Sequence, residues 1–390
     1  MPILQTCFAM LPMRVGINAR LLASADLRGW NRYTVNLLES LPQFDVELYL
    51  YTDAPLHASH LERLDGARCH VRVSPRMKYL FWEQQWLPQQ CRADHVDLLH
   101  SPFNFGLPWR SPCPRVLTLH DAIDRLDRHP SPLKNLTHLQ PAALLTTAYH
   151  WIARHSAEQI IAVSEHARDD LVRAYRLPTA RIAVVPEAAD RRFQTPVTSQ
   201  DRQRVRCEQR LTKPYVFYVG GWEDRKNVPF LVEAFARASV DNVELVLAGG
   251  REPWVSSIRE LAQSLGVADR LRLLSWVDDA DLPALYAEAL CLVYPSRYEG
   301  FGLQLCEAMA VGCPILSANA TSLPEVLGDA GELFGLNDTA ELTSLLRRVT
   351  AETAFRDDLA VRSRRGSARY CWTRTAEQTV NVYRRVMGNR

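Results

Sequence analysis

Lysine is scarce in this sequence of 390 residues, and neither sign of charge dominates it. Lys and Arg together number 46 against 44 Asp and Glu, which gives a formal net charge of +2 at pH 7. Residues 1–190 carry 20 basic against 19 acidic side chains, and residues 191–390 carry 26 against 25. Because neither half is a polycation, the balance argues against nucleic acid as a main partner. The basic residues are arginines except for four lysines, at Lys78, Lys134, Lys213 and Lys226.

Paired cysteine motifs and long apolar runs are also missing. The nine cysteines are scattered and none forms a Cys-x-x-Cys pair, so we expect neither a disulfide framework nor a zinc site. Residues 1–11 are mildly apolar but lack the basic start and cleavage pattern of a signal peptide. No stretch reaches the roughly 18 uninterrupted apolar residues that indicate a membrane-spanning helix. We therefore expect a cytoplasmic protein that keeps its cysteines as thiols.

The sequence does contain a repeated alternation of short apolar strands and helical segments. In the first half we expect strands at 14–18, 46–51, 70–73, 97–100, 116–119, 160–163 and 181–185. After a break at 186–196 and a polar segment at 197–212, we expect strands at 215–219, 243–248, 271–275, 290–294, 315–318 and 331–334. Strands separated by helices pair in parallel, and their ligands lie at the carboxyl ends of the strands. The pattern predicts an α/β chain of two doubly wound sheets with a ligand cleft between them.

Two glutamates, Glu299 and Glu307, follow strand 290–294 and flank a glycine-containing turn into an expected helix at 303–311. A helix start leaves backbone N–H groups unpaired and carries a partial positive charge, and glycine lets a phosphate approach closely. We hypothesise that this stretch binds a nucleotide-sugar. On spacing alone, a pair of ordinary solvated glutamates has equal weight.

A second strand-to-helix turn, at 220–227, contains two glycines and the adjacent cations Arg225 and Lys226. Two cations at the start of a helix oppose its dipole, so they gain nothing for the stability of that helix. They suit a site where an anion binds, such as a diphosphate held by the arginine fork and the lysine charge. The alternative is a pair of solvated surface charges.

Three further places end a strand or begin a helix on the expected ligand side. His120, next to Asp121, follows strand 116–119 and can hydrogen-bond or polarise a sugar hydroxyl near neutral pH, unless it is a structural loop histidine. For His100 we favour a structural role. Residues 29–32 lie between the first strand and the first helix, where the glycine would allow backbone approach.

Residues 76–86 combine four aromatic side chains with two cations. Such a segment can lie against a membrane interface, with its rings at the level of the lipid headgroups. A helix that places these aromatics in the core is the alternative that we favour.

The chain resembles the retaining glycosyltransferases of family 4 over residues 13–388, and the resemblance implies the GT-B fold of two facing Rossmann-like domains. The motifs are modest singly and specific in this order and spacing. They are Gly29 with Arg32 and Tyr33, His120 with Asp121, the runs 161–165, 184–186, 218–221 and 225–227, Val277 with Leu285 and Tyr286, the block 295–308, and Pro324 with Glu325.

The resemblance assigns a role to each matching position. It implies that Glu299 contacts the hydroxyls of the donor sugar, that Glu307 binds the ribose, and that His120 lies beside the sugar. Arg225 and Lys226 would neutralise the leaving diphosphate and replace the metal that other glycosyltransferases need. The implied donor-binding set is Gly220, Gly221, Val277, Gly300, Phe301, Gly302, Leu303 and Glu307, and the implied loop at the acceptor and the diphosphate contains Gly29 and Asn31.

The chain departs from the family pattern at three places. Gly221 stands where many relatives have an arginine, so Arg225 must supply the second charge. A Gly-x-Gly pattern reads 29–31 here and ends in Asn31, and an expected Asn-Gly is Glu187 with Ala188. The donor motif itself is intact, so we expect activity.

The resemblance also implies a domain plan. We expect an acceptor-side domain at 13–190, a nucleotide-sugar-binding domain at 191–370, and a final helix at 371–390 that returns to the first domain. Domain closure over the donor would exclude water.

The expected reaction is transfer of a hexose from a nucleotide-sugar to a hydroxyl of a saccharide, with retention at the anomeric carbon and with neither cofactor nor metal. The phosphate turn resembles that of bacterial enzymes of lipopolysaccharide O-antigen and exopolysaccharide assembly, so GDP-mannose leads UDP-sugars as the expected donor. A lipid-linked acceptor would explain contact with the cytoplasmic face of the inner membrane. The alternatives are another GT-B enzyme (an epimerase or a phosphorylase) and a catalytically silent partner in polysaccharide assembly.

Overall fold

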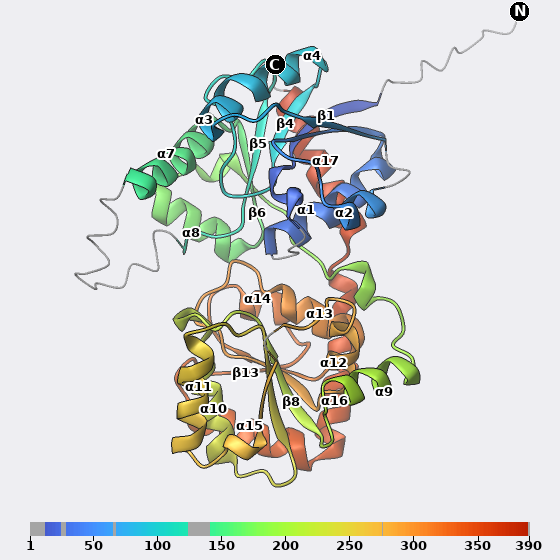
Figure 1. The fold of residues 1–390 in the computed structure, drawn as a ribbon, viewed down its shortest axis with the longest axis vertical. Helices are drawn as coiled ribbons and strands as arrows, with labels where there is room; N and C mark the ends of the chain where they lie inside the picture. The colour runs from blue at the N-terminus through green and yellow to red at the C-terminus, as the bar shows by residue number, and fades with distance from the viewer. Residues whose placement is uncertain (1–11, 25–28, 65–67, 124–140, 275, 389–390) are drawn as a thin grey trace, which may run out of the picture.

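The computed structural model describes residues 12–24, 29–64, 68–123, 141–274 and 276–388. Two α/β domains lie one above the other in Figure 1, with the N-terminal half above and most of the C-terminal half below. Each domain is built on one parallel sheet, as the alternation of strands and helices predicts.

The N-terminal sheet has seven strands in the order β3-β2-β1-β4-β5-β6-β7, and all of its pairs are parallel. Its strands are β1 (Met13–Asn18), β2 (Val46–Thr52), β3 (Cys69–Val73), β4 (Leu98–Ser101), β5 (Arg115–Leu119), β6 (Gln159–Ala162) and β7 (Ile182–Val184). The helices between them are α1 (Gly29–Ser40), α2 (Ala58–Arg63), α3 (Tyr79–Phe81), α4 (Leu87–Ala93), α7 (Pro141–Ser156) and α8 (Glu165–Tyr175).

The C-terminal sheet has six strands in the order β10-β9-β8-β11-β12-β13, again all parallel. Its strands are β8 (Tyr215–Val219), β9 (Glu244–Ala248), β10 (Leu271–Leu274), β11 (Cys291–Tyr294), β12 (Ile315–Ala318) and β13 (Glu332–Phe334). Its helices are α9 (Ser199–Glu208), α10 (Val228–Ala238), α11 (Trp254–Ser264), α12 (Leu282–Glu288), α13 (Leu303–Val311), α14 (Leu323–Leu327), α15 (Thr339–Ala351) and α16 (Thr353–Gly366).

The last helix, α17 (Trp372–Gly388), crosses back and packs on the N-terminal domain, as the resemblance implies (Figure 1). The ring of Trp372 meets Tyr33 of α1 edge-on, with 5.7 Å between the ring centroids. The hydroxyl of Tyr383 lies 2.7 Å from Nδ1 of His100, whose Nε2 lies 2.9 Å from the Thr118 hydroxyl. His100 is therefore a buried residue of the core, which confirms its structural role.

The central strands form because their apolar runs are covered on both faces by helices, which is the usual pattern of parallel sheets. Strands β4, β6, β9, β11 and β12 are buried along their whole length. The strand ends differ from the expected ones by a residue or two. The expected helical region 133–156 begins outside the described residues and is helical from Pro141 on.

The first helix, expected from about Asn31, begins two residues earlier. Gly29 is the first residue of α1, so residues 29–32 form its first turn. No atom of the described residues lies within 4 Å of where a Cβ at Gly29 would stand, so crowding by these residues does not require glycine there.

Candidate active site

A cleft of about 530 Å³ lies between the two domains and brings together most of the predicted site residues. It is lined from the N-terminal domain by Gly29, Trp30, Arg32, His120, Asp121, Val163 and Glu187. It is lined from the C-terminal domain by Gly220, Gly221, Arg225, Lys226, Val277, Asp279, Glu299, residues 300–304 and Glu307, with Trp222, Arg251, Trp254 and Trp276 among the others. Asn31 is the exception, because its side chain donates to the backbone oxygen of Leu21 at 3.2 Å.

Glu299 forms an ion cluster with the two cations of the turn before α10. Lys226 Nζ donates to Glu299 Oε1 at 2.6 Å, and Arg225 Nη1 lies 3.5 Å from Oε2. The Tyr294 hydroxyl lies 2.9 Å from Glu299 Oε1 and 3.1 Å from Lys226 Nζ. Among the described residues, Glu299 alone makes ion pairs with the two cations, so this paired cluster of three side chains keeps one formal positive charge. The carboxylates of Glu223 and Asp121 also line the cleft and act on Arg225 without an ion pair.

Burial sets the electrostatics of this cluster. The side chains of Lys226 and Glu299 are only 8% and 12% exposed, so the alternative of solvated surface charges is wrong for both. Burial alone raises the pKa of Glu299, but Lys226 and Arg225 outweigh it and hold that pKa below its ordinary value. Burial lowers the pKa of Lys226, and Glu299 offsets part of that effect. An incoming diphosphate would therefore meet a desolvated cationic surface, where electrostatic attraction is strong.

Two glycines shape the turn between Glu299 and α13. Gly302 caps the helix at φ +107°, a left-handed conformation that favours glycine, and no side chain among the described residues caps the first N–H groups. A Cβ at Gly300 would overlap the backbone oxygen of His120, so only glycine lets the two domains approach this closely. The turn therefore leaves the start of α13 open to the cleft.

Glu307, inside α13, is paired across the cleft. Arg32 of α1 makes an ion pair with Oε1 of Glu307, and its other terminal nitrogen lies 2.9 Å from Asp279 Oδ1. The Tyr286 hydroxyl donates to Glu307 Oε2 at 2.8 Å. Burial raises the pKa of Glu307 above its ordinary value, and Arg32 offsets only part of that rise. With 2% of its side chain exposed, Glu307 is not a solvated glutamate.

His120 reaches the cleft, but both of its ring nitrogens have protein partners. Nδ1 lies 2.8 Å from Glu187 Oε1, and Nε2 lies 3.0 Å from the backbone oxygen of Pro102. Burial lowers the pKa of His120, but the hydrogen bond and charge of Glu187 outweigh it and raise that pKa above its ordinary value. Two acceptors favour the doubly protonated ring. Direct contact of His120 with a sugar stays a prediction.

Hydrogen bonds also join the two domains directly. Ser164 caps α8 and donates to the Gly300 oxygen at 2.6 Å, and Tyr298 donates to Asp170 at 2.8 Å. The Glu325 carboxylate accepts from the first two backbone N–H groups of α8, at 2.9 and 3.1 Å. A carboxylate at the start of a helix is favoured by the helix dipole.

Sequence reasoning missed several residues of the cleft. Glu187 was noted only as a departure from a motif, and Asp279 and Trp276 were not considered, although both flank Val277 closely in sequence. Arg32 was part of the resemblance but received no role. Its pairing with Glu307 spans 275 positions of the chain, and no local pattern indicates it.

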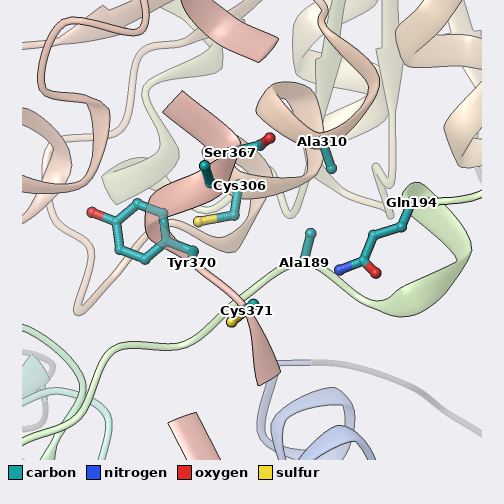
Figure 2. Close-up of a pocket in the computed structure, with 8 residues that line it drawn as sticks. Ala189, Gln194, Cys306, Ala310, Ser367, Tyr370 and Cys371 are labelled. Carbon is teal, nitrogen blue, oxygen red and sulfur yellow. The ribbon is translucent and has the colours of Figure 1, made fainter. Parts of the chain in front are cut away.

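A smaller hollow of about 330 Å³ lies where the two connections between the domains meet α13 (Figure 2). Its lining has no charged side chain and consists of Ala189, Gln194, Cys306, Ala310, Ser367, Ala368, Tyr370 and Cys371. A polar, charged ligand is therefore better matched by the larger cleft.

The segment at 76–86 divides between core and surface. Trp82 is fully buried, as the favoured core interpretation predicts, whereas Leu80 and Phe81 are 45% and 49% exposed.

Across the part of the chain that the structure describes, no group of three or more His, Cys, Asp or Glu side chains is placed to hold a metal ion. Within the same described ranges, no helix has the length and apolar character to cross a membrane.

Comparison with known proteins gives two family matches that together cover most of both domains. A family model described as Glycosyltransferase Family 4 matches residues 27–193, and one described as Glycosyl transferases group 1 matches residues 199–365. A glycosyltransferase of known structure from Rickettsia africae superposes with a TM-score of 0.74 at 14% identity, over 97% of this chain and 100% of that one. This likeness confirms the GT-B fold.

Two curated relatives extend the match to sequence. The D-inositol 3-phosphate glycosyltransferase of Salinispora tropica is 30% identical over 403 residues, which cover 92% of this chain and 81% of that protein. The O-antigen chain mannosyltransferase B of Escherichia coli is 31% identical over 233 residues, 59% of this chain, and the match spans 61% of that relative's length. With a matching family model in each domain and a 30% identical relative matched over 81% of its length, the chain belongs to glycosyltransferase family 4 and is a GT-B glycosyltransferase.

Proposed function

We propose that this glycosyltransferase moves a hexose from a nucleoside-diphosphate sugar to a saccharide hydroxyl, with retention at the anomeric carbon. The observation that carries the proposal is the buried cluster of Arg225, Lys226 and Glu299, which lines an interdomain cleft beside the uncapped start of α13. A diphosphate is the part of such a donor that needs two cations and free backbone N–H groups.

In the proposed reaction, the bond between the anomeric carbon and the diphosphate oxygen breaks while the acceptor oxygen bonds to the same face of that carbon. The acceptor's proton passes to the leaving phosphate oxygen, so no separate protein base is assigned. Negative charge grows on the diphosphate as it departs, and Arg225 and Lys226 stabilise it there. We propose that these two cations take the place of a metal. EDTA should then leave turnover unchanged, and loss of turnover that Mg²⁺ restores would contradict this.

GDP-mannose is the donor that we propose first, with UDP-sugars next. The similarity to an O-antigen chain mannosyltransferase, whose name states a mannosyl transfer, supports a mannosyl donor, although the match spans only part of that protein. Glu299, in the turn before α13, contacts the two cations and would select the sugar. Glu307, inside α13, would bind the ribose whatever the sugar.

A lipid-linked acceptor at the cytoplasmic face of the inner membrane completes the proposal. Leu80 and Phe81 in α3, with Trp109 and Trp151, are exposed large apolar side chains of the N-terminal domain at 45%, 49%, 49% and 47%. Trp109 stacks on Trp151 with 5.7 Å between ring centroids, and Tyr79 beside Leu80 packs against α7, which carries Trp151. Aromatic groups gathered in this way suit a membrane interface.

Binding to vesicles tests the membrane contact. We expect the wild type to sediment with phosphatidylglycerol vesicles and Phe81→Ser with Trp109→Ser to reduce that binding. Val361→Ser is the matched control, because Val361 is 64% exposed but lies on α16 of the other domain. Equal sedimentation of all three proteins would remove support for this surface.

A panel of nucleotides and nucleotide-sugars tests the donor. A ligand present at 100 times its Kd stabilises a protein by roughly 2.7 kcal/mol, which a thermal-shift assay detects. We expect GDP and GDP-mannose to give the largest shifts, and product analysis with a saccharide acceptor to show a retained anomeric configuration. A phosphorylase or an epimerase would instead consume phosphate or isomerise the donor without an acceptor. No shift with any nucleotide would favour a silent binding partner.

A further inference from the structure

The side chain of Arg32 reaches across the cleft and binds two carboxylates of the opposite domain. It starts in the first turn of α1 and makes ion pairs with Glu307 in α13 and with Asp279 in the loop before α12. Nη1 of Arg32 pairs with Glu307 and Nη2 pairs with Asp279, so both terminal nitrogens of the guanidinium are held. Arg32 also lines the cleft itself.

We propose that Arg32 is a donor-positioning residue that holds the Glu307 carboxylate ionised and oriented from across the cleft. This inference rests on the proposed function, because it takes Glu307 as the group that binds the donor's ribose. It adds a residue of the acceptor-side domain to the donor site, so that the site is complete only when the two domains are closed.

The chemistry of the buried carboxylate explains why such a partner is needed. Ribose hydroxyls donate hydrogen bonds, and only the ionised carboxylate offers acceptors on both oxygens. Glu307 has 2% of its side chain exposed, and burial alone favours its protonated form. Arg32 supplies the opposing charge at Oε1, and Tyr286 fixes Oε2 by its 2.8 Å hydrogen bond.

The charges around the pair are arranged to keep the fork in place. Asp279 anchors the second terminal nitrogen of Arg32, and Arg192 lies 3.4 Å from the other oxygen of Asp279.

Titration calorimetry with GDP and with UDP tests the inference in the intact protein. We expect Arg32→Met to bind the preferred nucleotide about 10- to 100-fold more weakly, the effect of losing a hydrogen bond to a charged group. Arg32→Lys keeps the charge without the fork, so we expect an intermediate affinity. Arg14→Met is the matched control, because Arg14 pairs with Glu47 inside the N-terminal domain and is not among the described residues that line the cleft.

The dependence of affinity on pH separates this role from a merely structural one. The groups that face Glu307 are Arg32, Tyr286 and Asp279, the last paired with Arg192. In Arg32→Met the opposing cation is gone, so Glu307 should take up a proton at a higher pH than in the wild type, and nucleotide affinity should fall as the pH is lowered through that range. The wild type and Arg32→Lys should change much less over the same range.

Each outcome decides between the possibilities. Unchanged affinity and an unchanged pH profile in Arg32→Met would overturn the role of Arg32 alone. Tighter binding would also overturn it, because Arg32 would then occupy the place of the nucleotide. If the melting temperature of Arg32→Met lies well below that of the wild type, Asp279→Asn is used as the test variant in its place. That variant frees one end of the fork and should also weaken binding. A wild-type protein that binds no nucleotide would refute the proposed function itself.

Discussion

Replacement of Lys226 by alanine tests the proposed stabilisation of the leaving diphosphate. Lys226 is buried, and its ammonium group lies 2.6 Å from Glu299 Oε1 and 3.1 Å from the Tyr294 hydroxyl. In the proposed reaction it faces the charge that develops on the diphosphate. Removing one such preorganised donor lowers the rate by about 10²- to 10³-fold, so we expect kcat/KM to fall by at least about 10².

That loss corresponds to about 2.7 kcal/mol of transition-state stabilisation. Lys226 also offsets the buried charge of Glu299, and removing one partner of a buried ion pair destabilises a fold by roughly 3–5 kcal/mol. We expect a cost at the lower end of that range, because Arg225 remains 3.5 Å from Glu299 and Tyr294 still donates to it. Activity must therefore be measured well below the melting temperature of the variant.

The assay is release of nucleoside diphosphate from the identified donor, with acceptor present. Lys213→Ala is the matched control. Lys213 lies before the amino end of β8, whereas Lys226 follows the carboxyl end, and Lys213 is not among the described residues that line the cleft. The reasoning is refuted if folded Lys226→Ala turns over near the wild-type rate. A loss that appears only in KM would assign Lys226 to donor binding and not to the transition state.

Three further predictions concern stability, closure and the donor. Burial raises the pKa of Glu83 to about 7 from its ordinary 4.5. Between these two pH values the folded protein holds a proton on Glu83 that the unfolded chain has released, so the free energy of unfolding should fall as pH rises through this range. Glu83→Gln should remove that loss and stabilise the protein at pH 8 by up to roughly 3 kcal/mol, with little gain near pH 4.5, in urea unfolding. The methyl group of Gly300→Ala would clash with the backbone oxygen of His120 and keep the two domains apart. Nucleotide should therefore no longer reduce the radius of gyration measured by small-angle scattering. A normal reduction in this variant would contradict the packing argument. Glu307→Ala should weaken the binding of nucleoside diphosphates with or without a sugar, whereas Glu299→Ala should change which sugar is accepted. Calorimetry with GDP and with GDP-mannose would separate these two roles. Unchanged GDP affinity in Glu307→Ala would contradict this division of roles.

The strands, the sheets and the donor motif could be predicted because their causes are local. An apolar run such as β8 makes a buried strand wherever helices cover it, and a turn such as 299–302 lies where a strand meets a helix. The same locality placed Arg225 and Lys226 at the start of a helix and Glu307 inside another. The sequence by itself therefore determined the fold class and which segments face the cleft.

The partners of the charged residues were decided by the tertiary structure alone. Lys226 and Glu299 are 73 positions apart, His120 and Glu187 are 67 apart, and Arg32 and Glu307 are 275 apart. No periodicity or spacing encodes such pairs, because they depend on how two sheets face each other and on how far side chains reach across the cleft. Burial then decides their chemistry, since the same carboxylate that would be solvated on a surface needs an arginine or a lysine once water is excluded.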